Sequence, residues 1–304
     1  MAKEWQELQF IRSDGVVYNL HSPPSRAVLN MSGWGKPVNN FHTTSGPYQH
    51  GETPISYRLS PRTISLELVH TFQSRSQWYN GRSSMLAQMG VNNASPNLPL
   101  PGVLRWHYII NGVYTIRDLD IFTVSGLGFT PLEGWREWSV LESMEFIAHN
   151  PIIYDPTVHT SAVSTFYDSL IFPMNFPFVL GTSYGIMDVT YGGTWEEYPT
   201  ITVTGPAAGV YIENYTTGKK LRLNYTVSLN ETITFDLKYN TKTITSDSGQ
   251  DLSQYLSDDS DLGEFNLQYD PIVPDGINTI IVYTIGATTG TTFTFTYYNR
   301  YYGI

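Results

Sequence analysis

The sequence of 304 residues predicts a mainly β protein of two domains, with a single helix in the first domain. Three observations lead to this fold class. Short segments alternate apolar and polar residues with a period of two, which is typical of strands with one buried face. Gly, Pro and Asn separate these segments at regular intervals, as in β-sandwiches. The chain is also longer than most single domains, and only one segment has a helical period.

Two hairpins and two further strands are expected in the first half of the chain. Apolar residues on both sides of Ser13-Asp14-Gly15 predict an opening hairpin. Residues 62–71 alternate Ile and Leu with Thr, Ser and Glu, which predicts a strand with one buried face. Asn111-Gly112 between two apolar runs predicts a second hairpin, and residues 138–147 alternate as residues 62–71 do. These elements together indicate a sandwich-like β domain.

One helix is expected shortly after the strand at residues 62–71. Four apolar residues share one helical face: Trp78, Met85, Leu86 and Met89. Ser76 is placed to cap the start of the helix, and Gly90 stands where a C-terminal glycine is common. The shared face predicts that Trp78 belongs to the core.

Residues 30–54 show no regular pattern and are rich in Gly and Pro. A loop of this length in a compact domain is usually functional or lies at an interface. Trp34 stands in it between Gly33 and Gly35, and we expect it to be the most exposed tryptophan of the chain. Exposed aromatic residues serve protein interfaces at least as often as sugar sites.

A domain junction is expected at residues 149–160, where Pro151 and Pro156 stiffen the chain. We therefore place an N-terminal domain at residues 1–155 and a C-terminal domain at residues 156–304. Charge changes at this point, because the first part carries 11 Lys/Arg against 12 Asp/Glu and the second 6 against 15.

Beyond the junction the pattern predicts a β-sandwich with essentially no helix. Between residues 200 and 227, three strands are separated by turns at Gly205-Pro206 and Thr217-Gly218. Residues 280–283 (IIVY) are apolar throughout, and we expect a strand that is buried on both faces.

Composition excludes several classes of protein. The sequence has no Cys, which removes disulfides, thiolate metal sites and Cys nucleophiles and fits synthesis in a reducing cytoplasm. A net charge of -10 argues against direct nucleic-acid binding, which needs basic side chains. No apolar run approaches the roughly 18 residues of a membrane helix, and no signal peptide is visible at the start.

Two patterns in the sequence could indicate catalytic residues, but neither fits the local structure that such a site requires. Ser183 stands in a G-x-S-x-G pattern, but a strand-like segment follows it where a nucleophile elbow requires a helix. Glu196 and Glu197 are adjacent, so on a strand they point to opposite faces and cannot flank one glycosidic bond. Both are expected to be surface carboxylates. The sequence thus offers no catalytic residues.

No metal site is expected either. The acidic residues near position 260 do not fit the spacing of an EF-hand loop and predict a solvated acidic loop: Asp258, Asp259, Asp261 and Glu264. The seven histidines lack the i, i+2 or i, i+4 pairing of metal ligands: His21, His42, His50, His70, His107, His149 and His159. We therefore expect no cofactor and no metal.

Three stretches together resemble the distal tail proteins of long-tailed phages. They are residues 60–66 (SPRTISL), residues 145–155 (EFIAHNPIIYD) and residues 193–223, which residues 256–262 and 274–278 follow at family-like spacing. In the second stretch, His149-Asn150 stands where an acidic residue often precedes the Pro. The resemblance implies that residues 1–155 form a sandwich with one helix that closes into a hexameric ring. It also implies that residues 156–304 form a galectin-like sandwich, which in some relatives is associated with saccharide binding.

The resulting interpretation is a structural protein of the virion. It would form a homo-hexameric ring at the phage tail tip, be made in the bacterial host cytoplasm, and join the tail tube protein to a tail-tip hub or tail-associated lysin protein. Receptor-binding proteins are further expected partners, whereas nucleic acid and membrane insertion are not. The alternative is a carbohydrate-binding adhesin module that recognises host surface glycans. An enzyme is the third class and the least supported.

Overall fold

The computed structural model describes residues 7–304 except 24, 91, 96–97, 111, 129, 132–138, 165–181, 240 and 289. The chain forms two compact units. One unit contains the residues up to Pro156 together with Tyr301–Ile304, and the other contains Thr157–Arg300. The last four residues therefore lie with the first unit, although they follow the second unit in sequence. No helix in the described part of the chain is long and apolar enough to cross a membrane.

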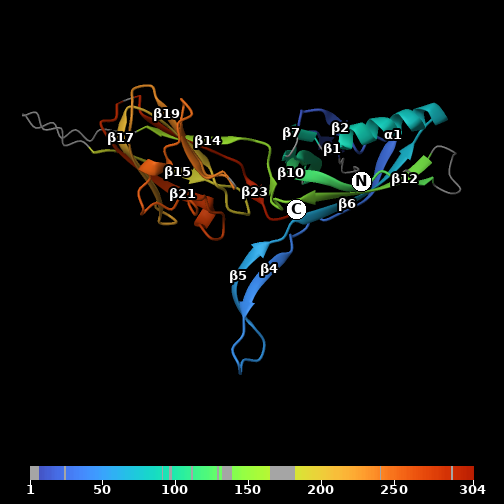
Figure 1. Cartoon of the computed structure of the whole chain (residues 1–304), viewed down its shortest axis with the longest axis horizontal. Coiled ribbons are helices and arrows are strands. Elements are labelled where there is room, and N and C mark those ends of the chain that lie inside the picture. The colour runs from blue at the N-terminus through green and yellow to red at the C-terminus, as the bar shows by residue number, and fades with distance from the viewer. Residues whose placement is uncertain are drawn as a thin grey trace, which may run out of the picture. The chain divides into compact units, whose positions relative to one another are not determined.

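The first unit is built on one long sheet whose central strand belongs to both of its halves (Figure 1). Its main strands are β1 (Glu7–Ile11), β2 (Val17–Asn19), β3 (Arg26–Ser32), β6 (Arg62–Thr71), β9 (Gly102–Ile110), β10 (Val113–Gly126) and β12 (Ser139–Ala148). They follow one another in the order β2-β1-β9-β10-β12-β6-β3. The first nine residues of β10 pair with β9, and its last residues pair with β12. Apolar side chains of both halves therefore meet in one core.

Short strands complete the first unit: β7 (Asn92–Ser95), β8 (Leu98–Leu100), β11 (Thr130–Pro131), β13 (Ile153–Tyr154) and the end of β23 (Arg300–Tyr301), whose first residue belongs to the second unit. Strand β23 pairs with β13, which in turn pairs with β10. The ring of Tyr301 packs against the core of this unit, and the guanidinium of Arg117 lies 3.8 Å from its centroid. The C-terminal residues are thus an integral part of the first unit.

The predicted strands of the first half are confirmed. Ile64, Leu66 and Leu68 of β6 are buried and alternate with exposed residues. Strand β12 covers the predicted segment from residue 139 onward, and Trp138 lies outside the described residues. The opening hairpin has Gly15 at φ +86°, a conformation that glycine adopts without strain. In the second hairpin Ile110 pairs with Val113, and Asn111 of its turn lies outside the described residues.

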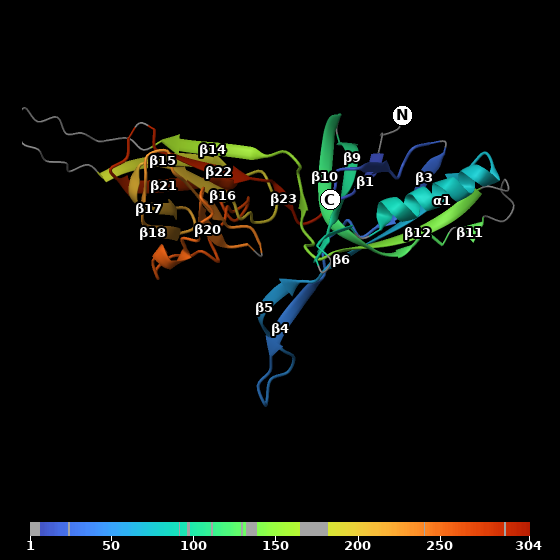
Figure 2. The same cartoon turned by 45° about the horizontal axis from the view of Figure 1, so that its top comes forward.

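The one α-helix among the described residues of the first unit is α1 (Arg75–Met89), which lies along the half of the sheet formed by β3, β6 and β12 (Figure 2). Ser74 caps it, because its Oγ accepts a hydrogen bond from the Gln77 amide at 3.3 Å. The predicted cap at Ser76 is therefore two residues too late. Met85 and Met89 are buried and Trp78 packs against the core, as predicted, but Leu86 is exposed.

Residues 30–54 do not form the irregular loop that the sequence predicted. Strand β3 extends to Ser32, and after a short connection β4 (Asn39–Thr44) and β5 (Thr53–Leu59) form a separate two-stranded ribbon. We call residues 38–60 the arm. In Figure 1 it leaves the body of the first unit and extends beyond it.

The second unit is a sandwich of two antiparallel sheets. One has the order β14-β22-β16-β19-β20 and the other β15-β21-β17-β18. The bounds are β14 (His159–Ser164), β15 (Thr182–Thr190), β16 (Thr200–Thr204), β17 (Ala207–Asn214), β18 (Lys219–Val227), β19 (Thr232–Asp236), β20 (Thr243–Ser246), β21 (Ile277–Ile285) and β22 (Thr292–Tyr297). Its described helical segments are two short 3-10 turns, Ser253–Tyr255 and Pro274–Gly276. The predicted class, mainly β with one α-helix, is confirmed.

Alternation fixes which face of each sheet is buried. Ile201 and Val203 of β16 and Phe293 and Phe295 of β22 are fully buried between the sheets. The prediction that residues 280–283 are buried on both faces is wrong. Ile280 and Val282 enter the core, whereas Tyr283 is exposed on the other face. The outer face of this sheet therefore exposes some apolar side chains.

Candidate functional site

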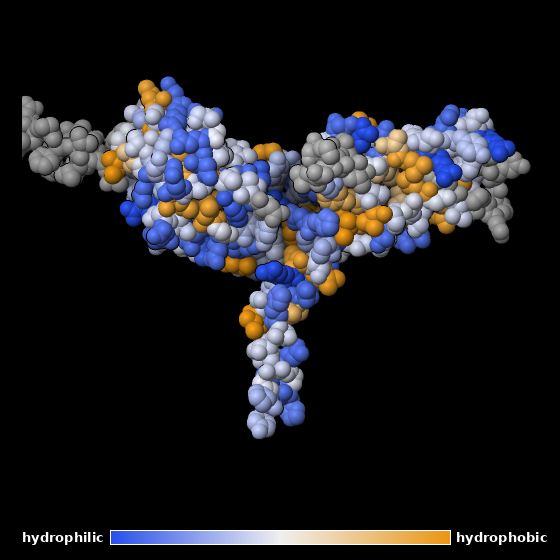
Figure 3. All heavy atoms as spheres, in the orientation of Figure 1, coloured by the Kyte–Doolittle hydropathy of each residue, from blue (hydrophilic) through white to orange (hydrophobic). Residues whose placement is uncertain are grey.

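The arm exposes several large apolar side chains. Its two strands are antiparallel, with Asn39 opposite Leu59 and Phe41 opposite Tyr57, and the rings of Phe41 and Tyr57 are 6.1 Å apart. The exposed set is Val38, Phe41, Tyr48, Ile55 and Tyr57, with exposed fractions from 50% for Tyr57 to 99% for Tyr48. Figure 3 shows an orange, hydrophobic patch on the shaft of the arm.

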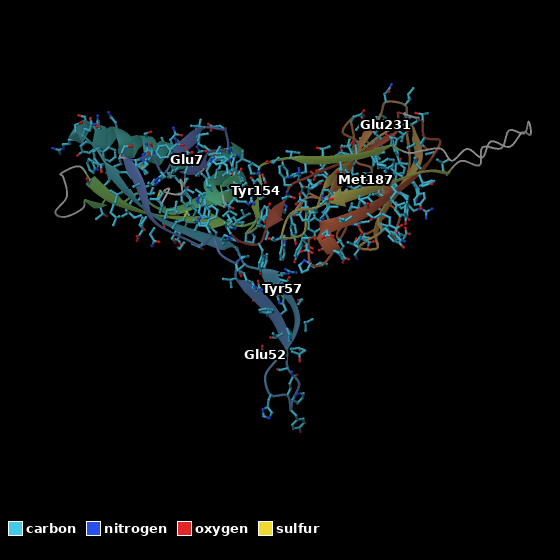
Figure 4. The ribbon with its side chains drawn as sticks, turned by 180° about the vertical axis from the view of Figure 1, so that it is seen from behind. Glu7, Glu52, Tyr57, Tyr154, Met187 and Glu231 are labelled. Carbon is cyan, nitrogen blue, oxygen red and sulfur yellow. The ribbon has the colours of Figure 1, made fainter. Side chains whose placement is uncertain are left out.

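An isolated two-stranded ribbon is at best marginally stable in water. The arm has unpaired strand edges, and apart from its base almost all of its residues are exposed. Figure 4 labels Tyr57 on the shaft near the base of the arm and Glu52 nearer the tip. Exposed apolar residues of this kind are typical of a surface that binds another molecule.

Arg62 holds the base of the arm in place. Its Nε donates to the carbonyl of Pro151 at 2.9 Å, and its Nη1 donates to the carbonyls of Gly33 at 3.0 Å and Gly35 at 2.6 Å. Its Nη2 donates to the carbonyl of Tyr302 at 2.9 Å. Burial lowers the pKa of Arg62 to about 10, so the side chain is still a cation near neutral pH. One buried guanidinium therefore joins β6, the segment before the arm and the C-terminus.

Two further contacts fix the first residues of the arm. The hydroxyl of Tyr302 donates to Oδ1 of Asn39 at 2.6 Å, and the amide of Ser60 donates to the carbonyl of Val38 at 2.8 Å. The arm therefore begins from a rigid base even though its shaft is solvated.

Trp34 is buried, not exposed as the sequence predicted. Only 6% of its surface is exposed, and its ring packs against Trp106 with centroids 5.1 Å apart. Its carbonyl accepts a hydrogen bond from the amide of Ile304 at 3.1 Å. Gly33, at φ +97°, lies so close to the backbone of Thr63 that a side chain would not fit. The glycines therefore allow close packing on β6 and do not expose Trp34.

The outer face of the four-stranded sheet in the second unit carries a row of aromatic side chains. Tyr184 of β15 lies opposite Tyr283 of β21, which lies opposite Tyr211 of β17. Tyr211 lies in turn opposite Arg222 of β18. The rings of Tyr211 and Tyr283 are 5.5 Å apart. Burial and a hydrogen bond to Glu213 raise the pKa of Tyr211 to about 12, so its phenol is neutral.

Isoleucines extend this row into an apolar surface. The exposed members on the same face are Ile186, Ile277 and Ile285. Together with Tyr184 and Tyr283 they form what we call the outer sheet face. Contiguous exposed apolar surface of this kind often marks a site of protein interaction.

The adjacent carboxylates Glu196 and Glu197 differ in their surroundings. Glu197 is buried and paired with Arg300, so the expectation of a surface carboxylate is wrong for this residue. Burial raises its pKa, and the Arg300 guanidinium opposes that change. Glu196 is half-buried and lines a groove. The two carboxyl groups therefore serve separate environments.

The acidic loop near residue 260 is paired with lysines of β18 and is not simply solvated. Asp259 lies 2.8 Å from Nζ of Lys220, and Asp261 lies 3.5 Å from Nζ of Lys219, which also pairs with Glu264. No cluster of three or more His, Asp or Glu within the described residues is arranged to hold a metal ion.

Ser183 lies within β15, where its backbone pairs with Thr284. The strand continues to Thr190, so no helix follows Ser183 as a nucleophile elbow requires. Gly181 of the motif lies outside the described residues.

The sequence patterns did not lead us to predict the arm or the outer sheet face, although each corresponds to a recognisable pattern of residues. The arm appears as two runs, residues 39–44 and 53–59, on either side of a turn with Gly46 and Pro47. The outer sheet face appears as aromatic and Ile residues at the positions that alternate with the core, as in Tyr283 and Ile285.

The C-terminal sandwich matches a known protein family. The family model described as the siphovirus-type tail component, C-terminal domain, matches residues 192–301. No curated protein matches the sequence at a significant level.

Solved structures from phages share the fold. The crystal structure of SPP1 Dit, described as a paradigm of the hub adsorption apparatus in phages that infect Gram-positive bacteria, matches with a TM-score of 0.63 and 15% identity. The match covers 96% of this chain and 98% of that chain. Chains of the phage P2 baseplate in its activated conformation, with Ca and with Sr, match at TM-scores of 0.48 and 0.43 and identities of 9% and 10%, with the same coverage.

These findings confirm the resemblance drawn from the motifs. The family model accounts for the C-terminal sandwich, and the likeness to SPP1 Dit accounts for the fold of both units. Residues 192–301 therefore match the C-terminal domain of the siphovirus-type tail components, and the chain has the fold of SPP1 Dit along nearly its whole length.

Proposed function

We propose that this chain is a distal tail protein, a structural hub of the phage tail tip that forms a hexameric ring between the tail tube and the tail tip. The observation that carries the proposal is the shared fold with SPP1 Dit over 96% of the chain, together with the tail-component domain at residues 192–301. The protein would be made in the cytoplasm of the bacterial host and reside in the virion.

The arm supports a ring. A closed ring needs a head-to-tail interface, in which one surface of each copy meets a different surface of the next. The arm offers such a surface, because its strand edges and the side chains of Phe41, Ile55 and Tyr57 are uncovered in the single chain. The N-terminal part is close to neutral, so copies of it repel one another little.

The outer sheet face supports docking of a further tail-tip protein. Its exposed Tyr and Ile side chains lie on the second unit, whereas the arm belongs to the first. One unit would therefore build the ring, and the other would hold a tail-tip hub, a tail-associated lysin or a receptor-binding protein. The role is structural and non-catalytic.

Native mass spectrometry and negative-stain imaging of the purified full chain test the proposal. We expect six copies and a ring with a central opening. Added tail tube protein, as a preassembled tube, provides the template if the free chain is a monomer. A chain that stays monomeric alone and also fails to cap the tube would contradict the hub function.

A further inference from the structure

We propose that a groove in the second unit binds an arginine side chain that a segment of a partner protein presents. The groove has a volume of about 460 Å³, and all of its lining residues lie within one unit of one chain, so the proposal does not depend on ring formation. Three features of the lining support it. They are a carboxylate without a cationic partner, hydrogen-bond acceptors that are held in place, and an apolar rim.

Glu196 supplies the carboxylate of the lining. One of its oxygens accepts a hydrogen bond from the Tyr198 hydroxyl at 3.0 Å, and the other accepts one from Nδ2 of Asn266 at 3.1 Å. Both donors are neutral, and among the described residues Glu196 forms no ion pair. A carboxylate has about four acceptor positions, so about two remain for a ligand. Two parallel hydrogen bonds from one guanidinium would fill them.

The lysines near this carboxylate are engaged elsewhere. Lys219 lies 3.5 Å from Asp261 and also pairs with Glu264. Nζ of Lys242 lies over the ring of Tyr198, 3.8 Å from its centroid. Burial lowers the pKa of Lys242, and the Glu196 carboxylate opposes that change without forming an ion pair. The lining therefore keeps an excess of negative charge, with Glu196 and Glu264 against Lys219.

Hydrogen bonds hold the other acceptors of the groove in place. Nε2 of Gln268 donates to Oδ1 of Asn266 at 3.1 Å, which leaves Oε1 of Gln268 without a partner among the described residues. A buried acceptor without a partner is costly, and a further N–H of the guanidinium would satisfy it.

Buried asparagines fix the backbone beneath these side chains. Asn278 donates to the carbonyl of Gln268 at 2.8 Å and accepts from its amide at 2.9 Å. Asn214 donates to the carbonyl of Asn266 at 2.9 Å. Because the site is already ordered, a ligand that binds there loses little further entropy to the ordering of the protein.

Apolar residues complete the lining. Ile272 is 60% exposed, and Val273 lies next to it in the chain and also lines the groove. The methylene groups of an arginine side chain can pack on such a surface while the guanidinium reaches a carboxylate. The groove therefore offers a partner for both parts of an arginine side chain.

The chemistry favours arginine over other side chains. A guanidinium is planar, presents five donors in a fixed fork and is more weakly hydrated than the ammonium of lysine. The C-terminal part of the chain carries 6 Lys/Arg against 15 Asp/Glu, which attracts a basic segment and repels an acidic one. The partner is therefore a basic protein segment with an exposed arginine.

Methyl NMR of the full chain with labelled isoleucine δ1 groups tests the proposal, because Ile272 lies in the groove. The probes are three blocked pentapeptides, Gly-Ser-Xaa-Ser-Gly, in which Xaa is arginine, lysine or citrulline, the uncharged analogue of arginine. We expect the Ile272 signal to shift saturably with the arginine peptide, at a concentration at least about tenfold lower than with the lysine peptide. The citrulline peptide should cause no shift, and Ile186 and Ile285 of the outer sheet face should not respond.

Three substitutions locate the binding site. Glu196→Gln should weaken binding of the arginine peptide about tenfold. Glu264→Gln changes a side chain that is 71% exposed, so it leaves the fold intact, and should weaken binding about twofold through the loss of a negative charge. Glu213→Gln is the matched control and should have no effect. Tyr211 donates to Glu213 at 2.9 Å as Tyr198 donates to Glu196, but Glu213 does not line the groove.

The proposal is overturned if the arginine peptide leaves the Ile272 signal unchanged, or if the lysine or citrulline peptide binds as tightly. It is also overturned if Glu213→Gln weakens binding as much as Glu196→Gln, or if neither Glu196→Gln nor Glu264→Gln changes the affinity.

Discussion

The arm and the C-terminal sandwich are both antiparallel β structure, but they treat their apolar residues in opposite ways. The sandwich buries Phe235, Phe293 and Phe295 completely between two sheets. The arm is a single ribbon and leaves Phe41 and Tyr48 in solvent. A second layer makes the difference, since a sheet can hide one face only against another element.

The two regions therefore differ in what stabilises them. The sandwich has a core of its own, so its free energy of unfolding is a property of the single chain. The arm has only its cross-strand pairs and its base at Arg62. We infer that the arm gains its missing second layer from another molecule, which makes it the part of the chain whose order depends on assembly.

Deletion of the arm tests this comparison most strongly, because it should have the largest effect on ring formation. We expect that replacing residues 39–59 with a short Gly-Ser link abolishes the ring, because the uncovered surface is gone. The melting temperature of the free chain should change little, because the shaft adds nothing to either core. Native mass spectrometry and calorimetry measure the two effects. A ring that persists without the arm would refute its role.

A matched pair of Phe→Ala substitutions compares the two regions directly. Phe235→Ala should lower the free energy of unfolding of the second unit by about 3–5 kcal/mol, because it leaves a cavity in a closed core. Phe41→Ala should change the stability of the free chain by less than about 0.5 kcal/mol and yet weaken assembly. Urea denaturation followed by mass photometry tests both. Equal losses of stability would contradict the distinction.

Acid should lower the free energy of unfolding of the first unit, which carries the arm. Burial lowers the pKa of His70, on β6, from 6.5 to about 4. The unfolded chain therefore takes up a proton first, and stability is lost as the pH falls from about 6.5 to about 4, by at most about 3 kcal/mol. His70→Gln should flatten this dependence in urea denaturation measured across that pH range. An unchanged slope in the variant would show that other groups are responsible.

The contacts at the base of the arm should depend on the planar guanidinium of Arg62. Arg62→Lys keeps the charge but cannot reach four carbonyls at once, so we expect a loss of about 2 kcal/mol in the first unit. Hydrogen exchange at the amides of Ser60 and Ile304, which donate to carbonyls at the base of the arm, should accelerate, while the second unit stays unchanged. Equal protection in Arg62→Lys would mean that the arm is held mainly by other contacts.

Much of the fold could be predicted because its patterns are local. Residues 62–71 and 200–204 alternate cleanly, since each has one face in a core and one in solvent. The arm escaped prediction because neither of its faces is buried, so no alternation marks it. Isolated turns and glycines then suggested an irregular loop.

The remaining errors come from partners that are distant in sequence. Trp34 stands between glycines, and its burial depends on Trp106 and on the returning C-terminus. Glu197 is buried and pairs with Arg300, which lies 103 residues later in the sequence. The groove that Glu196 lines is likewise formed by three separate segments of the second unit, so no single sequence motif predicts it.

Hydrogen–deuterium exchange of the arm in the free and the assembled protein tests the central claim most directly. We predict that amides of residues 39–59 exchange rapidly in the single chain and at least about tenfold more slowly in the ring, while those of the sandwich strands β16 and β22 do not change. Equal exchange of the arm in both states would show that assembly does not cover it, and would contradict the account.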